Sequence, residues 1–154
     1  MLNKMEQRPH MDPSEITAKH VDIQKILANK KVRLPNWATR MMERLLHIDE
    51  INSTIYRHRD KFGLDFVHAF LEGTHPEDLN AKIEVINPEN IPTEGYPIVA
   101  GNHPLGGPDG LALMAAVGRY RQDIQFPVTD FLLYLPGPAP LFVPIDKVNR
   151  NNAN

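Results

Sequence analysis

The sequence contains no cysteine, which excludes disulfide bridges and thiolate metal sites and is consistent with a reducing compartment. No run approaches the ~20 apolar residues that a membrane-spanning helix needs, and the N-terminus lacks the apolar core of a signal peptide. A basic surplus is also missing, because 17 Lys and Arg residues stand against 19 Asp and Glu residues. These absences argue against a secreted disulfide scaffold, a membrane-spanning protein and a nucleic-acid partner.

What is present is typical of a globular chain of ordinary domain size. The 154 residues are 42% hydrophobic and 23% charged, and a fold of this length can bury close to ~70% of its unfolded surface. Proline divides the chain, since 11 of the 14 prolines fall at or after Pro76. We therefore expect a mobile tail over 1–12, a helical region over 13–75, and the first part of an α/β domain over 76–154.

Apolar spacing of three and four residues predicts the helices of the N-terminal region. Asp12 followed by Pro13 and Glu15 is typical of a helix start. Apolar positions then predict helices near 21–29, from residue 37 to about 55 with two apolar faces, and over 64–71. On the first of those two faces lie Trp37, Met41 and Leu45.

The second half predicts strands on either side of a helix. Residues 82–86 alternate polar and apolar, and residues 96–100 form a short apolar run that indicates a buried strand. A helix is expected over 108–120, with further strands at 124–128 and 141–145. This order predicts the α/β class, with a helical N-terminal cover followed by a strand-helix-strand core.

The loop between the second expected strand and the helix carries the candidate chemistry. His103 can exchange a proton near neutral pH, and Asp109 follows six residues later in the first turn of the expected helix. Gly106 and Gly107 let the chain fold back, so that the carboxylate could orient the imidazole as a general base. No Ser, Thr or Cys lies in this loop, which favours a base acting directly on a substrate hydroxyl over a covalent acyl-enzyme.

Structural explanations of the same residues stay open. Asp109 would favour the positive end of a helix, and His103 would hydrogen-bond to backbone. The glycines would serve only the turn, because no Lys-Ser or Lys-Thr follows them as in a phosphate loop. The uncharged stretch 131–145 would contact an acyl chain or be a buried strand-loop-strand. The remaining histidines form no H-E-x-x-H pattern, so no metal site is predicted.

The segment N-H-P-L-G-G-P-D-G, residues 102–110, resembles the signature of the glycerophospholipid acyltransferases, the family of 1-acylglycerol-3-phosphate acyltransferases. The usual family pattern is N-H-x-x-x-x-D, in which His is the base and Asp its partner. Here five residues separate His103 from Asp109, one more than usual, as in a bacterial branch of the family. The segment L-F-V-P-I-D-K, residues 141–147, resembles the second block, with Lys147 in place of the usual phosphate-contacting Arg.

The resemblance implies transfer of a fatty acyl group from acyl-CoA or acyl-carrier protein to a hydroxyl of a lysophospholipid or glycerol-phosphate-like acceptor. It implies no cofactor and no metal. The partners would be the donor thioester, the lipid acceptor and a membrane surface, with the protein peripheral at the cytoplasmic inner face. By the same resemblance, the catalytic residues would be His103 and Asp109, and the substrate-binding residues Asn102, Gly106, Gly107 and Lys147.

Two other functions stay open at this point: a lipid or thioester hydrolase, and a non-catalytic lipid-binding module. The third and fourth blocks of the family do not follow residue 147. We therefore expect the chain to be the N-terminal part of a longer enzyme and to lack acyl transfer activity alone. For the same reason we expect an exposed apolar surface near residues 141–145.

Overall fold

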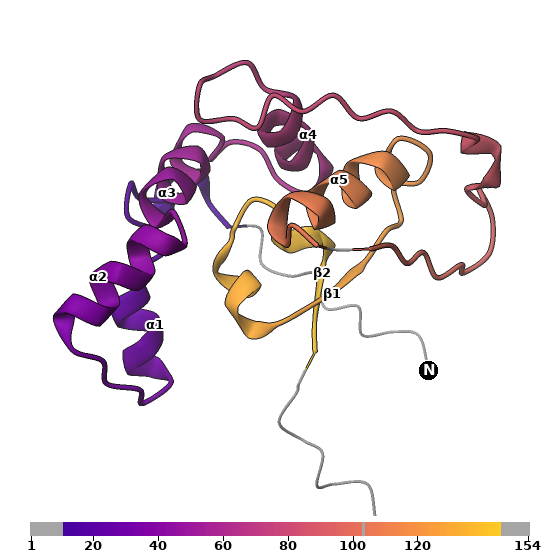
Figure 1. Ribbon diagram of the computed structural model, residues 1–154. Helices are drawn as coiled ribbons and strands as arrows, with labels where there is room; N and C mark the ends of the chain where they lie inside the picture. The colour runs from indigo at the N-terminus through magenta and orange to yellow at the C-terminus, as the bar shows by residue number, and fades with distance from the viewer. Residues whose placement is uncertain (1–10, 103, 146–154) are drawn as a thin grey trace, which may run out of the picture.

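The computed structural model describes residues 11–102 and 104–145, and Figure 1 shows the arrangement of its elements. The α-helices and strands of this part are α1 (Ile23–Asn29), α2 (Asn36–Leu45), α3 (Ile48–Arg57), α4 (Leu64–Glu72), α5 (Gly107–Gly118), β1 (Phe126–Val128) and β2 (Phe142–Pro144). Short 3-10 turns lie at Pro13–Glu15, Pro88–Asn90, Asp130–Tyr134 and Ala139–Leu141.

The helices predicted near 21–29, over 64–71 and over 108–120 are confirmed, whereas the helix expected from residue 37 to about 55 is divided into α2 and α3. Helices α2 and α3 are separate because His47 lies in the left-handed region, with φ of 51°. The helix start predicted at Asp12 is only a 3-10 turn, in which the Asp12 carboxylate accepts from the Ser14 amide at 2.8 Å. The turn ends there because Ile16 takes an extended conformation and is buried in the core.

The strands predicted at 124–128 and 141–145 are confirmed over residues 126–128 and 142–144, as β1 and β2. They pair in parallel, with Phe126 opposite Phe142 and Val128 opposite Pro144. The Ile145 amide donates to the Val128 carbonyl at 2.9 Å and extends the pairing by one bond. The result is a set of helices with a small parallel sheet, which is compatible with the α/β class.

The strands predicted at 82–86 and 96–100 are wrong. Both segments are irregular, and the second is not buried, since Ile98 is 96% exposed. A strand needs a neighbour that satisfies its backbone hydrogen bonds. Within the described residues the sheet consists of β1 and β2 alone. An irregular segment therefore precedes α5, where a strand-helix-strand core required a strand.

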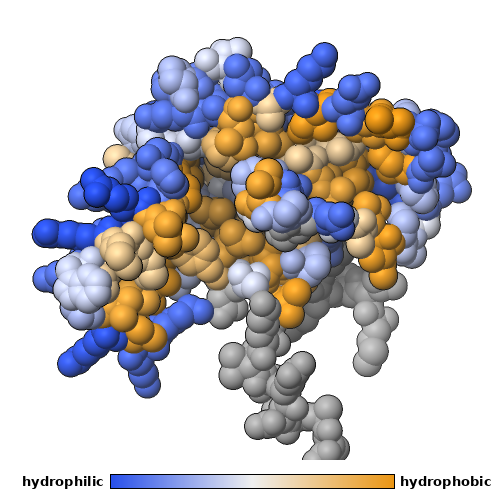
Figure 2. Space-filling view, viewed as in Figure 1, coloured by the Kyte–Doolittle hydropathy of each residue, from blue (hydrophilic) through white to orange (hydrophobic). Residues whose placement is uncertain are grey.

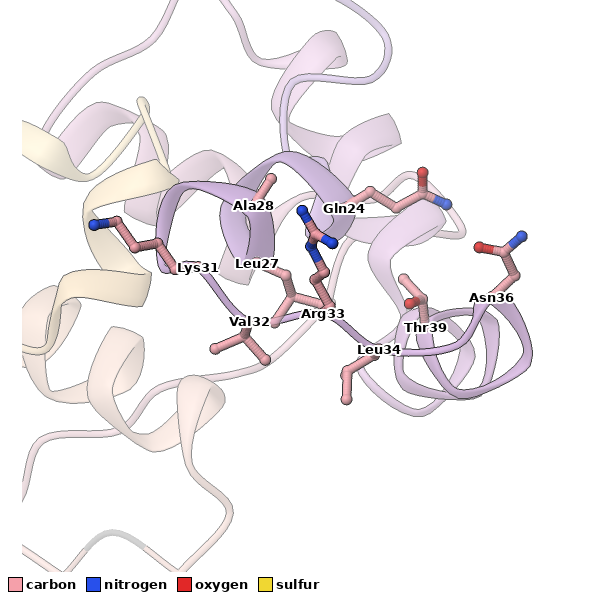
Figure 3. Close-up of a pocket in the computed structure, with 9 residues that line it drawn as sticks. All are labelled: Gln24, Leu27, Ala28, Lys31, Val32, Arg33, Leu34, Asn36 and Thr39. Atoms are coloured by element: carbon pink, nitrogen blue, oxygen red, sulfur yellow. The ribbon is translucent and has the colours of Figure 1, made fainter.

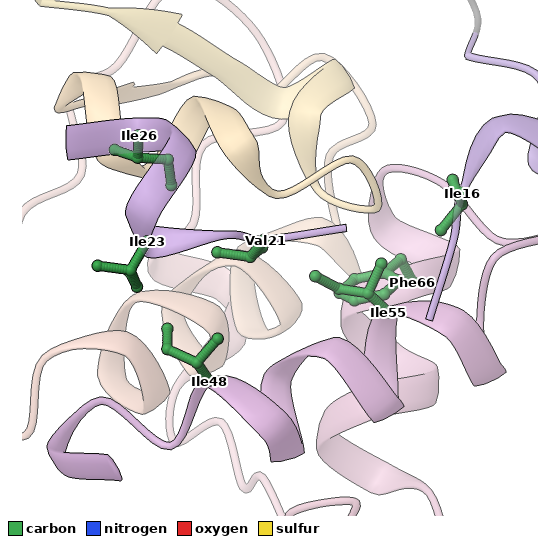
Figure 4. Close-up of a cluster of buried hydrophobic side chains, with 7 residues drawn as sticks. All are labelled: Ile16, Val21, Ile23, Ile26, Ile48, Ile55 and Phe66. Atoms are coloured by element: carbon green, nitrogen blue, oxygen red, sulfur yellow. The ribbon is translucent and has the colours of Figure 1, made fainter. Parts of the chain in front are cut away.

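Two clusters of buried apolar side chains meet at α4. The first joins the N-terminal segment to α3 and α4 (Figure 4), through Ile16, Val21, Ile23, Ile26, Ile48, Ile55 and Phe66. The second joins α4 to α5 and the sheet, through Val67, Leu71, Met114, Ala115, Val128, Leu141 and Phe142. Packing against α4 and the strands thus holds α5, the helix that carries the motif loop at its start.

The prediction of an exposed apolar surface at 141–145 is wrong for the first two of these residues. Leu141 and Phe142 are buried, and only Ile145 among the large apolar residues there is more than a third exposed. The side chains of α4 and α5 cover them in the second cluster. The exposed apolar residues lie instead in the irregular segment before α5 and on α2.

Replacing Gly137 with alanine is expected to destabilise the fold. A Cβ atom at this position would overlap the ring of Phe66, which is buried in the first cluster. Overpacking of this kind costs about 1–3 kcal/mol, and urea unfolding would measure the loss. Gly101→Ala is the matched control, because no described atom lies within 4 Å of its added Cβ. An equal loss in both variants would contradict the prediction.

Candidate active site

Helix α5 begins in the motif loop at a glycine pair. Gly106 precedes the helix with φ of 77°, a backbone conformation that glycine adopts without strain. Gly107 is the first helical residue, and Pro108 follows in the first turn, a position where its missing N–H leaves no helical bond unmade. These residues turn the irregular segment 96–102 into the helix and place Asp109 at its start.

The Asp109 carboxylate folds back over this turn. Its Oδ2 accepts a hydrogen bond from the Leu105 backbone N–H at 2.6 Å, so an early-helix acid satisfies an amide just before the helix, much as in a capping box. The side chain is half-buried. Among the described residues, its second oxygen, Oδ1, has no hydrogen-bond partner. The carboxylate is thus held toward the motif loop with one oxygen left for another donor.

The structure describes four of the six predicted site residues. Gly106, Gly107 and Asp109 lie at the start of α5, and Asn102 is an exposed residue of the irregular segment that precedes the helix. His103 and Lys147 lie outside the described residues. The bond from the Leu105 N–H holds the Asp109 carboxylate at the positive end of the helix, and its pairing with His103 stays a prediction.

Arg121 holds the segment that leads into the motif, a role that the sequence did not reveal. Its guanidinium donates to the backbone carbonyls of Pro92 and Gly95, each at 2.9 Å, and pairs with Asp123 at 2.6 Å. The hydrogen bond between the two side chains raises the pKa of Arg121 and lowers that of Asp123. The turn-rich sequence 92–95 indicated that its backbone carbonyls would lack strand partners. No feature of that sequence indicated that their hydrogen-bond donor would be a side chain more than 25 residues away.

A second His-Asp pair connects α3 to the turn after α4. His58 Nε2 lies 3.0 Å from Asp78 Oδ1, and the His75 backbone N–H donates to Asp78 Oδ2 at 3.2 Å. Arg57 pairs with the same carboxylate at 3.4 Å and also with Glu77. The Asp78 side chain is only 3% exposed and that of His58 12% exposed. This pair is closed to a substrate, and its role is structural.

Asp78 is expected to make the free energy of unfolding depend on pH in the acid range. Burial opposes its charged form, but the hydrogen bond from His58 and the nearby positive charges outweigh burial and lower the pKa of Asp78. Because the pKa of Asp78 in the folded protein lies below its unfolded value of about 3.9, the ionised carboxylate stabilises the fold at pH values above about 3.9. This stabilisation is lost as the pH falls through the folded pKa. Urea midpoints should therefore fall less steeply below pH ~4 in Asp78→Asn than in the parent protein. Asp60→Asn, an exposed carboxylate, should keep the parental slope, and a parental slope in Asp78→Asn would contradict the prediction.

Two surface grooves lie near α2, away from the motif loop. One, of about 710 Å³, is lined by residues of α1, of the segment between α1 and α2, and of α2 itself; Figure 3 shows Arg33 over α1 and Leu34 directed away from it. The other, of about 760 Å³, is lined by residues of α2 and the start of α3. Over the described residues, no helix is long and apolar enough to cross a membrane, and no cluster of acidic and histidine side chains is arranged to hold a metal ion.

The chain matches the family model described as "Acyltransferase" over residues 23–154. It is 39% identical over 135 residues to a lyso-glycine lipid O-acyltransferase of Bacteroides thetaiotaomicron, covering 84% of this chain and 48% of that protein. It is 38% identical over 137 residues to a lyso-glycine lipid O-acyltransferase of Phocaeicola vulgatus, covering 86% of this chain and 47% of that protein. No solved structure matches significantly.

The family model covers the N-H-P-L-G-G-P-D-G segment, whose last four residues begin α5. The chain belongs to the acyltransferase family. It spans about half the length of the curated relatives that it matches.

Proposed function

We propose that this chain carries the catalytic base of an O-acyltransferase that moves a fatty acyl group from a thioester to a lyso-lipid hydroxyl. The observation that supports this most is the Asp109 carboxylate, held by Leu105 over the motif loop with one oxygen free of described partners. Family membership supplies the class of reaction. The donor would be acyl-CoA or acyl-carrier protein.

His103 would remove the proton from the acceptor hydroxyl as its oxygen attacks the thioester carbonyl. A C–O ester bond forms and the C–S bond breaks, and His103 then returns the proton to the sulfur, which leaves as the free thiol. Asp109 would fix the imidazole tautomer and balance the positive charge that develops on the ring. Asn102, Gly106 and Gly107 would border the substrate at the start of α5. No cofactor is required by this scheme.

The acceptor would be a lyso-lipid with an anionic group, reached at a membrane surface on the cytoplasmic side. The two relatives are named for lyso-glycine lipid, which makes that lipid the first acceptor to test and lysophosphatidic acid the second. Lys147 would hold the anion, whether it is a carboxylate or a phosphate.

The test uses the longest natural reading frame that contains residues 1–154, incubated with acyl-CoA or acyl-carrier protein thioester and each acceptor. Mass spectrometry of the lipid extract should show the O-acylated acceptor and an equal amount of released thiol. Free fatty acid without acylated acceptor would instead show a hydrolase. Lipid binding without turnover, unchanged by His103→Ala, would show a binding module.

Replacing Lys147 with alanine is expected to raise KM for an anionic acceptor more than it lowers kcat. An ion pair that is equally strong in the ground state and the transition state changes KM alone. Steady-state kinetics with an anionic lyso-lipid and with an uncharged analogue of the same chain length would measure the difference. If the ratio of kcat/KM for the anionic acceptor to kcat/KM for the uncharged acceptor is the same in variant and parent enzyme, Lys147 does not bind the anion.

A further inference from the structure

Helix α2 turns its apolar face toward solvent. Trp37, Met41 and Leu45 are 69%, 60% and 75% exposed, and their spacing of four places them on one face. The helix meets the rest of the protein through the opposite side, where Thr39 is buried. Surface helices normally bury their apolar stripe, but the described residues leave the stripe of α2 uncovered.

Hydrophobic and hydrophilic residues lie side by side at the α1–α2 end of the molecule (Figure 2). Val32 and Leu34, which precede the helix, are also exposed. Residues 30–46 contain five basic residues and one acidic residue, whereas the whole chain has a net charge of −2. The exposed Arg40 and Arg44 follow Trp37 and Met41 by three residues, so they lie beside the stripe.

We infer that the stripe Trp37, Met41 and Leu45, together with Arg40 and Arg44, is a docking surface for an anionic lipid bilayer. An indole ring suits the boundary between headgroups and acyl chains, and Arg side chains pair with anionic headgroups. A second copy of the chain, docked through this same face, would bring the same basic residues together. A bilayer satisfies both features.

The inference deepens the proposed function, because it rests on a lipid acceptor reached at a membrane surface. Its geometry is independent of the motif loop, since the stripe lies on α2 and the motif at the start of α5. Vesicle binding and acyl transfer are measured separately, so either proposal can fail while the other stands.

Trp37 is the only tryptophan of the chain and therefore reports its own insertion. The 154-residue chain is mixed with vesicles of phosphatidylcholine alone, or of phosphatidylcholine with phosphatidylglycerol. We expect a blue shift of Trp37 emission and quenching by brominated acyl chains with the anionic vesicles. Met41→Ser with Leu45→Ser, which keeps the probe, should weaken partitioning roughly tenfold or more. Arg40→Gln with Arg44→Gln should weaken binding to anionic vesicles about 25-fold, at about fivefold per charge.

The matched controls are Arg59→Gln with Lys82→Gln, which removes two exposed charges elsewhere, and Ile86→Ser, which removes an exposed apolar side chain. Both should bind vesicles as the parent does, and circular dichroism should show all variants folded. Absence of vesicle binding, binding with unchanged Trp37 emission, or equal losses in the controls would overturn the inference. A blue shift that follows protein concentration without lipid would identify a second copy as the partner and overturn it as well.

Discussion

Replacing His103 with alanine is expected to lower kcat by roughly 10²- to 10⁴-fold, the contribution typical of a positioned general base. KM for either substrate should change little, because the imidazole acts on the reacting proton rather than on the remote parts of the lipid. The measurement is the initial rate of acyl transfer by the longest natural reading frame, with thiol release and lipid product followed together.

The control for this prediction is His68→Ala. His68 lies on α4 and pairs with Glu72 at 3.2 Å, so its replacement removes an imidazole that lies outside the motif. We expect parental kcat in that variant. Full activity in His103→Ala, with unfolding midpoints equal to those of the parent, would remove His103 from the mechanism.

Asp109→Asn is expected to have the second large effect, a loss of roughly 10² to 10⁴ in kcat, since the wrong imidazole tautomer would be favoured. The amide oxygen can still accept the Leu105 N–H bond that the carboxylate oxygen accepts at 2.6 Å. The start of α5 and the stability of the fold should therefore persist. Kinetics and urea unfolding of the same preparation separate the two roles.

The pH dependence distinguishes a positioning role from a capping role. Removing the negative charge beside a base should move the acidic limb of the kcat/KM profile to lower pH. Asp65→Asn is the matched control, because Asp65 also lies in the first turn of a helix, α4, away from the motif. If Asp109→Asn loses only stability, or keeps both the parental rate and the parental pH profile, then Asp109 is a cap and nothing more.

The helices were predictable from the sequence because their information is local. Side chains three and four residues apart share a helical face whatever surrounds them, so apolar spacing located α1 to α5. The motif was equally local. Gly106 and Gly107 could be expected to make a turn and Asp109 to begin a helix, and the structure has both.

The strands were predicted unevenly because a strand depends on its neighbour. Residues 126–128 and 142–144 pair as parallel strands. The similar apolar run at 96–100 has no strand partner among the described residues and is exposed. Alternation and apolar runs are properties of one segment, and backbone pairing is a property of two. The sequence could not state which runs would pair.

By itself, the sequence determined the family motif, the spacing of its acid and base, and the helical periodicities, all of which are set by residues close together in the chain. The tertiary structure alone decided which apolar faces are covered. It buried Phe142 under α4 and α5 and left the stripe of Trp37, Met41 and Leu45 in solvent. It also brought His58 and Arg57 to Asp78 and Arg121 to the 92–95 turn. Burial and long-range hydrogen bonds depend on packing between distant segments, and that packing is decided only when the whole chain folds.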